Sequence, residues 1–220
     1  MSLSSPLAQA FYHHPAGLCG HHDPAAPLAQ IERIETRLQT ITFVSLLPSP
    51  NMQVILTQQS HWLFDSTQVA YKTSQQVSEA LHAAQIRTPK HISRVWWQIC
   101  RGIQGRFKGS IRTLLQNSHN DARAIQTYLS QSRTTFPVLS AQTTSARWLD
   151  MLHRIGGIEL THWDELREPL TAKQQKSARQ FGFAEEHLHP SLALALRTWT
   201  SACHRRDVDT CGLKHCPRHA

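Results

Sequence analysis

The sequence predicts an all-α fold, on three observations. Apolar residues recur at spacings of three and four along most of the chain, as on one face of a helix. No segment alternates apolar and polar residues for long, and no internal repeat is present. The 220 residues, 40% hydrophobic and 17% charged, have the composition of a globular protein long enough to bury a core. We expect a helical domain over residues 28–202, preceded by a flexible tail (1–27) and followed by a Cys/His-rich loop (203–220).

The tail is predicted from its composition. Residues 1–27 hold four of the eleven prolines and two histidine pairs, His13-His14 and His21-His22. The pairs could contact a metal ion, and the alternative is a flexible polar tail. No basic segment is followed by an apolar one, so we expect no secretory signal and a cytoplasmic location. No apolar run approaches the roughly 18 residues that span a bilayer, so no membrane association is expected.

The first part of the domain is expected to contain two helices and a short apolar segment at 52–56. One helix is predicted from about residue 27 to the prolines at 48 and 50. Its apolar stripe consists of Ile31, Ile34, Leu38 and Ile41. The other is predicted over 66–86, capped by Ser66. Its apolar face consists of Val69, Thr73, Val77 and Leu81.

A third helix is predicted to begin at Pro89, which suits the first helical position. Its apolar stripe consists of Ile92, Trp96, Ile99, Ile103, Phe107, Ile111 and Leu114. At about 100° per residue, the cations that fall opposite this stripe are Lys90, Arg94, Arg101, Lys108 and Arg112. Gly102, Gly105 and Gly109 each cost about 1 kcal/mol relative to Ala in a helix, so a break is predicted within GIQGRFKG.

Two further helices are expected over residues 121–131 and 144–154, joined by the connector RTTFPVLSAQT at 133–143. The second is predicted to bury Trp148, Met151, Leu152 and Ile155. Gly156-Gly157 would end it. Short helices are expected at about 160–167, 172–182 and 190–203.

The net charge of +8 is concentrated in the second part of the chain. Residues 1–85 carry a net charge of −2 and residues 86–220 one of +10. From Arg87 to Arg133, nine residues are basic and only Asp121 is acidic. Such a cluster indicates a surface that binds phosphate groups, and the alternative is a solvated basic face. The candidate phosphate-binding cations are Lys90, Arg94, Arg101, Arg106, Lys108 and Arg112.

The connector is a second candidate for phosphate binding. A turn that leads into a helix presents backbone N–H groups without intrahelical partners, and these bind anions. Small side chains in the turn would let a phosphate approach. The residues expected to do this are Ser140, Ala141, Thr143 and Thr144. The alternative is an ordinary corner between two helices.

Scattered positions over residues 90–220 resemble a known family. They are Phe136, Pro137, Leu139, Trp148, Met151 and Leu152, with Arg106, Phe107 and Lys108 upstream and Pro169 and Gly182 downstream. On these residues the chain resembles the endonuclease III-like (HhH-GPD) DNA glycosylases with a helix-hairpin-helix element, and most closely those that end in an iron–sulfur loop. The resemblance implies a DNA-binding helical fold that flips a damaged base and cleaves its N-glycosidic bond.

The catalytic positions of that family are altered here. Ala141 stands where the family's hairpin has glycine, and Thr143 where its lyases have lysine. Near the expected aspartate the chain reads PLTAKQQ, with Thr171 and no carboxylate. The carboxylate that stabilises positive charge on the sugar, and the amine that forms a Schiff base, are therefore not in their family positions. Nearby groups that would substitute are Glu165, Glu168 and Lys173. The catalytic residues stay unknown.

Five cysteines make a disulfide framework a poor interpretation, because the number is odd and no export signal is present. Cys19 and Cys100 are expected to be buried or idle thiols. The last segment has the spacing C-x7-C-x4-C-x2-H, which predicts a zinc or iron–sulfur site. Its ligands would be Cys203, Cys211, Cys216 and His219, with His204 and His215 as competing fourth ligands. The alternative is three free thiols.

Two classes of function follow. The first is a protein that binds double-stranded DNA, either as a glycosylase or as a catalytically silent relative. The second is a non-enzymatic helical module that binds nucleic acid or an acidic protein partner, with the Trp96-Trp97 pair as anchors. A weaker third interpretation is a redox or metal-handling protein. The tryptophans expected instead to lie in the core are Trp96, Trp148, Trp163 and Trp199.

Overall fold

The computed structural model describes residues 25–47, 50–58, 61–180, 183, 185–194 and 196. In these residues the fold is all-α, as predicted, apart from two strands of two residues each. They form two units, a helical unit at residues 24–163 and a C-terminal unit that begins at Asp164. The division falls within the predicted domain at 28–202. None of the helices in the described part combines the length and apolar character that crossing a bilayer requires.

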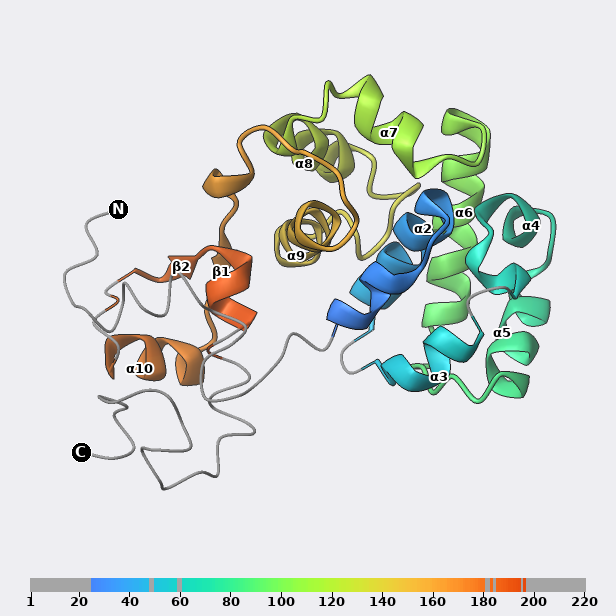
Figure 1. Ribbon diagram of the computed structural model, residues 1–220, viewed down its shortest axis with the longest axis horizontal. Helices are drawn as coiled ribbons and strands as arrows, with labels where there is room; N and C mark the ends of the chain where they lie inside the picture. The colour runs from blue at the N-terminus through green and yellow to red at the C-terminus, as the bar shows by residue number, and fades with distance from the viewer. Residues whose placement is uncertain are drawn as a thin grey trace. The chain divides into compact units, whose positions relative to one another are not determined.

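The helical unit begins with η2 (Ala26–Gln30), α2 (Ile34–Ser45), α3 (Met52–Thr57) and η3 (Trp62–Phe64). Leu38 and Ile41 of the predicted stripe are fully buried on α2, whereas Ile34 at its first position is 45% exposed. In Figure 1, α2 runs through the middle of this unit, and its neighbours include α9. The helix α2 is therefore the central helix of this unit.

The helix predicted over 66–86 is two helices, α4 (Ser66–Ala70) and α5 (Ser74–Ala83). Thr73 is extended and forms a capping box with Gln76, which starts α5 afresh. The cap of α4 is Asp65, whose carboxylate accepts hydrogen bonds from two backbone amides. Ser66, the predicted cap, is buried and donates instead to the carbonyl of Gly109 at 2.7 Å.

The predicted third helix is divided into α6 (Ile92–Phe107) and α7 (Ile111–Asn117). The break within GIQGRFKG is confirmed, at its last two residues. Lys108 and Gly109 take φ values of 52° and 79°, so the chain turns there and Ser110 caps α7. Gly102 and Gly105 stay helical. The predicted cations therefore do not all lie on one helix, because α6 ends before Lys108 and Arg112 lies on α7.

The connector links α8 (Ala122–Gln131) and α9 (Gln142–Arg154), so the two helices predicted there are confirmed. Beyond α9, residues 158–163 return to the start of α8, where Thr161 pairs with Asp121 in a parallel bridge. Asp121 caps α8 and also contacts the His162 ring at 2.9 Å. Desolvation raises the pKa of the Asp121 carboxyl, but bonds from two backbone amides and the His162 charge outweigh it and hold the pKa below its ordinary value.

The core is built around tryptophan and phenylalanine side chains. Trp96 and Phe43 are fully buried, with ring centroids 5.4 Å apart, and the indole N–H of Trp96 donates to a backbone carbonyl. The Trp148 indole N–H donates to Thr42 Oγ1 at 2.8 Å. The core prediction is thus confirmed for Trp96 and Trp148, Trp163 is half-buried, and Trp199 lies outside the described residues.

The C-terminal unit contains α10 (Ala172–Gln180) and the antiparallel strands β1 (Glu168–Pro169) and β2 (His187–Leu188). The helix predicted over 160–167 is wrong, because only the 3-10 turn η4 (Trp163–Glu165) forms there before the chain enters β1. The helix predicted from 172 is confirmed as α10. The end of the one predicted from 190 lies outside the described residues.

Candidate functional site

The outer side of α6 carries a row of basic residues. Arg94, Trp97, Arg101 and Gly105 follow one another at steps of three and four, so they share one face of the helix. Lys90 precedes this row and Lys108 follows it. We call these six residues the α6 cationic face. The opposite side of α6 is buried in the core, at positions that include Ile99 and Ile103.

Arg101 is held in place by an aromatic ring. Its guanidinium lies 4.9 Å from the centroid of the Trp97 ring, within range of a cation–π interaction. The ring is fixed in turn, because its indole N–H donates to the backbone carbonyl of Lys72 at 2.7 Å. The Lys72 ammonium lies 5.6 Å from the Trp62 ring. Arg101 therefore loses less side-chain freedom on binding an anion than a free arginine would.

A hollow of about 560 Å³ lies beside this pair. We call it the α6 hollow. Its lining includes Arg94, Trp97, Arg101, Gly105, Arg106 and Thr135. No carboxylate of a described residue lines it. Thr135 belongs to the connector, which reaches α6 at Gly102, where an added Cβ would collide with the Thr135 side chain. The connector is thus one wall of the hollow and α6 another.

A larger hollow, of about 1120 Å³, lies near the N-terminal end of α6. Its cations are Arg87 and Lys90, His82 lines it beside them, and no carboxylate among the described residues lines it either. A third hollow, of about 720 Å³, is different, because Glu32 and Asp65 line it. The two hollows without carboxylates are therefore both associated with the predicted cations.

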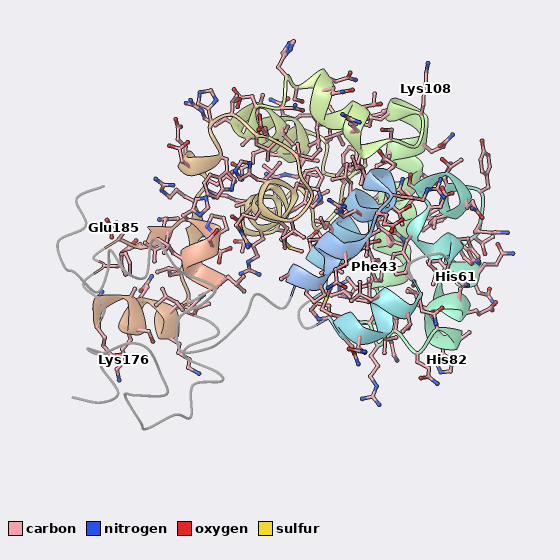
Figure 2. The ribbon with its side chains drawn as sticks, viewed as in Figure 1. Phe43, His61, His82, Lys108, Lys176 and Glu185 are labelled. Carbon is pink, nitrogen blue, oxygen red and sulfur yellow. The ribbon has the colours of Figure 1, made fainter. Side chains whose placement is uncertain are left out.

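The six predicted cations are brought together only in part. Arg94, Arg101 and Arg106 line the α6 hollow, and Lys90 lines the larger one. Figure 2 shows the Lys108 side chain pointing away from the helical unit. Arg106 also donates to the Tyr128 hydroxyl at 2.9 Å. Within the described residues, none of the six forms an ion pair with a carboxylate. Their charge is therefore available to a ligand.

The four turn residues that were expected to bind phosphate differ in whether their backbone amides are free to donate. The amides of Ser140 and Ala141 donate to carbonyls of the connector itself, Phe136 and Val138. The sequence suggested that these two amides lack hydrogen-bond partners, but both have one within the connector. Ala141 provides no side-chain cap for α9, and no described group accepts from the amides of Thr143 and Thr144. Amide contacts to an anion at this turn would come from the first residues of α9.

Val138 in this turn is strained. Its φ is 66°, in the left-handed region that β-branched residues avoid, and its side chain is 36% exposed. We expect Val138→Gly to be more stable than Val138→Ala by about 1 kcal/mol, because both variants lose the contacts of the valine methyl groups and only glycine adopts this φ without steric cost. Urea denaturation of the two variants checks this. A Gly variant no more stable than the Ala variant would contradict the explanation.

The substitutes proposed for the family's catalytic groups all belong to the C-terminal unit. Glu168 is fully buried in β1, whereas Glu165 and Lys173 are exposed. Cys100 is fully buried, and burial followed by the Asp65 charge raises the pKa of its thiol well above the ordinary value, so it is an unreactive core residue.

The predicted metal ligands Cys203, Cys211, Cys216 and His219 lie outside the described residues, as do His204, His215, Cys19 and the histidine pairs of the tail. Among the residues that are described, no group of three or more His, Cys, Asp or Glu side chains could hold a metal ion. The zinc or iron–sulfur site therefore stays a prediction from the spacing.

Comparisons with protein-family models, with curated proteins and with solved structures find no match. The resemblance to the HhH-GPD glycosylases therefore stays a prediction. Of the residues that carry it, Phe136, Leu139, Trp148 and Leu152 are at most 1% exposed. Core packing is a sufficient reason for large apolar side chains at these positions.

Two features of the site were missed by the sequence reasoning, Gly105 and Trp97. Gly105 was interpreted only as a weak helix position, and Trp97 only as a protein-interface anchor. Their signal was present, because both fall in the same i, i+4 row as Arg101. Thr135 had no such signal, since only the fold brings the connector against α6.

Proposed function

We propose that this protein binds double-stranded DNA through the α6 cationic face, by contacts to phosphate groups. The observation that carries the proposal is the pair of hollows near α6, which cations line and no described carboxylate does. Cations on a protein surface ordinarily have acidic neighbours. A ligand that supplies many negative charges is the natural counterpart of a row of cations without such neighbours.

The length of the face favours a polymer over a small anion. At about 1.5 Å per residue, the fifteen steps of α6 from Ile92 to Phe107 correspond to about 22 Å, and Lys90 and Lys108 lie beyond its two ends. Arg94 and Arg101 are seven residues apart, which is about 10 Å along the axis. No single small anion contacts all of these side chains. A DNA duplex carries one negative charge per roughly 1.7 Å of its axis and offers a phosphate to each.

The structure weakens one argument for the alternative, a protein-interaction module. Of the proposed anchors, Trp96 is fully buried in the core and Trp97 is half-buried with its N–H already bonded to Lys72. Neither offers an exposed apolar anchor. Trp97 instead serves to orient Arg101.

The experiment is a salt titration of duplex binding by fluorescence anisotropy. We expect the wild-type affinity to fall steeply with salt. In the triple variant Lys90→Ala/Arg101→Ala/Lys108→Ala, the negative slope of log K against log salt should become shallower by about 3. Each phosphate that the protein neutralises contributes about −0.9 to this slope. A matched triple variant, Arg33→Ala/Lys176→Ala/Arg179→Ala, removes the same charge from exposed positions outside α6 and should keep the wild-type slope.

Two results would overturn the proposal. One is a wild-type protein that does not bind duplex DNA, and the other is an equal change of slope in the two triple variants. Release of a base from duplexes that carry different lesions, measured on the same samples, tests separately the N-glycosidic cleavage that the resemblance implies.

A further inference from the structure

Gly105 is an unusual residue in α6. It lies within a 16-residue helix and is exposed, although glycine destabilises a helix interior relative to alanine. Packing does not require it, because nothing lies within 4 Å of the position that its Cβ would take. Gly102, one turn earlier, is the contrast, since a Cβ there would meet Thr135 of the connector. The open space at Gly105 is part of the α6 hollow.

Three guanidinium groups line the hollow around this open position. Arg101, one turn before Gly105, lies over the Trp97 ring. Arg106, the next residue, is held by the Tyr128 hydroxyl at 2.9 Å. Arg94 is exposed further along the same face. Two of the three are therefore positioned before any ligand arrives, which lowers the entropy lost on binding.

The chemistry of the lining selects an oxyanion. Guanidinium groups donate planar, paired N–H bonds that match phosphate oxygens, and they stay charged at all ordinary pH values. No carboxylate of the described residues competes for them in the hollow. The hollow is open to solvent and its volume of about 560 Å³ exceeds that of one phosphate, so a phosphate that belongs to a longer strand can enter it.

We propose that the α6 hollow binds one phosphate group of a nucleic-acid strand, with Arg101 and Arg106 as donors and Gly105 leaving the room that the phosphate occupies. Arg94, seven residues before Arg101, contacts the next phosphate of the strand. The identity of the ligand as nucleic acid rests on the proposed function. The phosphate is either a diester of the strand or the monoester at its end. A monoester carries a charge of about −1.5 to −2 at pH 7, so a site with two arginine donors favours it.

Gly105→Ala tests the proposal, because it separates folding from binding. The variant should unfold at a higher temperature than the wild type, since alanine is the better helix residue and has open space around it. It should also bind pyrophosphate at least tenfold more weakly, measured by calorimetry at low salt. Ser130→Ala on the exposed side of α8 is the matched control, which favours helix in the same way and should leave pyrophosphate binding unchanged.

Duplexes with 5′-hydroxyl and 5′-phosphate ends identify the source of the phosphate. A larger loss for the phosphorylated duplex in Gly105→Ala assigns the hollow to a strand end, and an equal loss assigns it to the backbone. Unchanged affinity of Gly105→Ala for pyrophosphate and both duplexes would overturn the hollow as a site, while the salt slope could still support duplex binding. Pyrophosphate binding that Gly105→Ala weakens, in a protein that binds no duplex, would overturn the proposed function and keep the site.

Discussion

Replacing Gly109 by alanine is expected to lower the free energy of unfolding by about 3 kcal/mol. Gly109 has a φ of 79° at the turn between α6 and α7, a conformation that costs an L-residue about 1 to 2 kcal/mol. An added Cβ would also collide with Thr67 Oγ1 and lie 2.7 Å from Gln104 Oε1. Both side chains are held, since Thr67 donates to Gln104 at 3.0 Å. Overpacking of this kind typically costs a further amount of about 1 to 3 kcal/mol.

Urea denaturation of two variants distinguishes the two costs. Gly105→Ala, in the preceding helix α6 and with open space around it, should gain up to about 1 kcal/mol. The double variant Thr67→Ala/Gly109→Ala removes the collision with the hydroxyl and should recover part of the loss, keeping the conformational strain. A Gly109→Ala variant as stable as the wild type would show that the α6–α7 turn does not need its left-handed conformation.

Replacing Gln39 by leucine is expected to cost about 2 to 3 kcal/mol. The side chain is 4% exposed, and its amide joins three parts of the helical unit. It donates to the Gly109 carbonyl at 3.1 Å and accepts from the Ser66 backbone N–H at 2.8 Å. Leucine would leave the Ser66 amide buried without this acceptor, and an unmet buried donor costs about 1 to 3 kcal/mol by itself.

The same substitution at an exposed glutamine provides the control. Gln75 on α5 is exposed and bonds only Glu79 of its own helix, at 2.9 Å. We expect Gln75→Leu to change the free energy of unfolding by less than about 0.5 kcal/mol. Equal midpoints of urea denaturation for the two variants would contradict a structural role for Gln39. A loss at Gln39 alone would show that the buried amide stabilises the turn where α6 ends.

Local sequence was sufficient for the helices and for their buried sides. The row from Ile92 to Phe107 predicted α6 and its core face, and Asp121 marked the start of α8. It was insufficient at residues 66–86 and 160–167. Thr73 could serve as a helical residue or as a cap, and the choice of the cap divides α4 from α5. In the second segment, Thr161 pairs with Asp121, forty residues earlier, and this long-range bridge replaces the expected helical turn.

For the candidate site, the sequence by itself determined the charge and the phase of the α6 cationic face, because residues three and four apart share a side of a helix whatever surrounds it. It could not determine the α6 hollow. That hollow depends on Thr135 meeting α6 beside Gly102, and on Lys72 holding Trp97, which in turn orients Arg101. The first two of these contacts join residues more than twenty positions apart, so no local pattern encodes them. These contacts form only once the core has packed the helices together. Tertiary structure therefore decided where the α6 hollow lies beside the basic face of the helix.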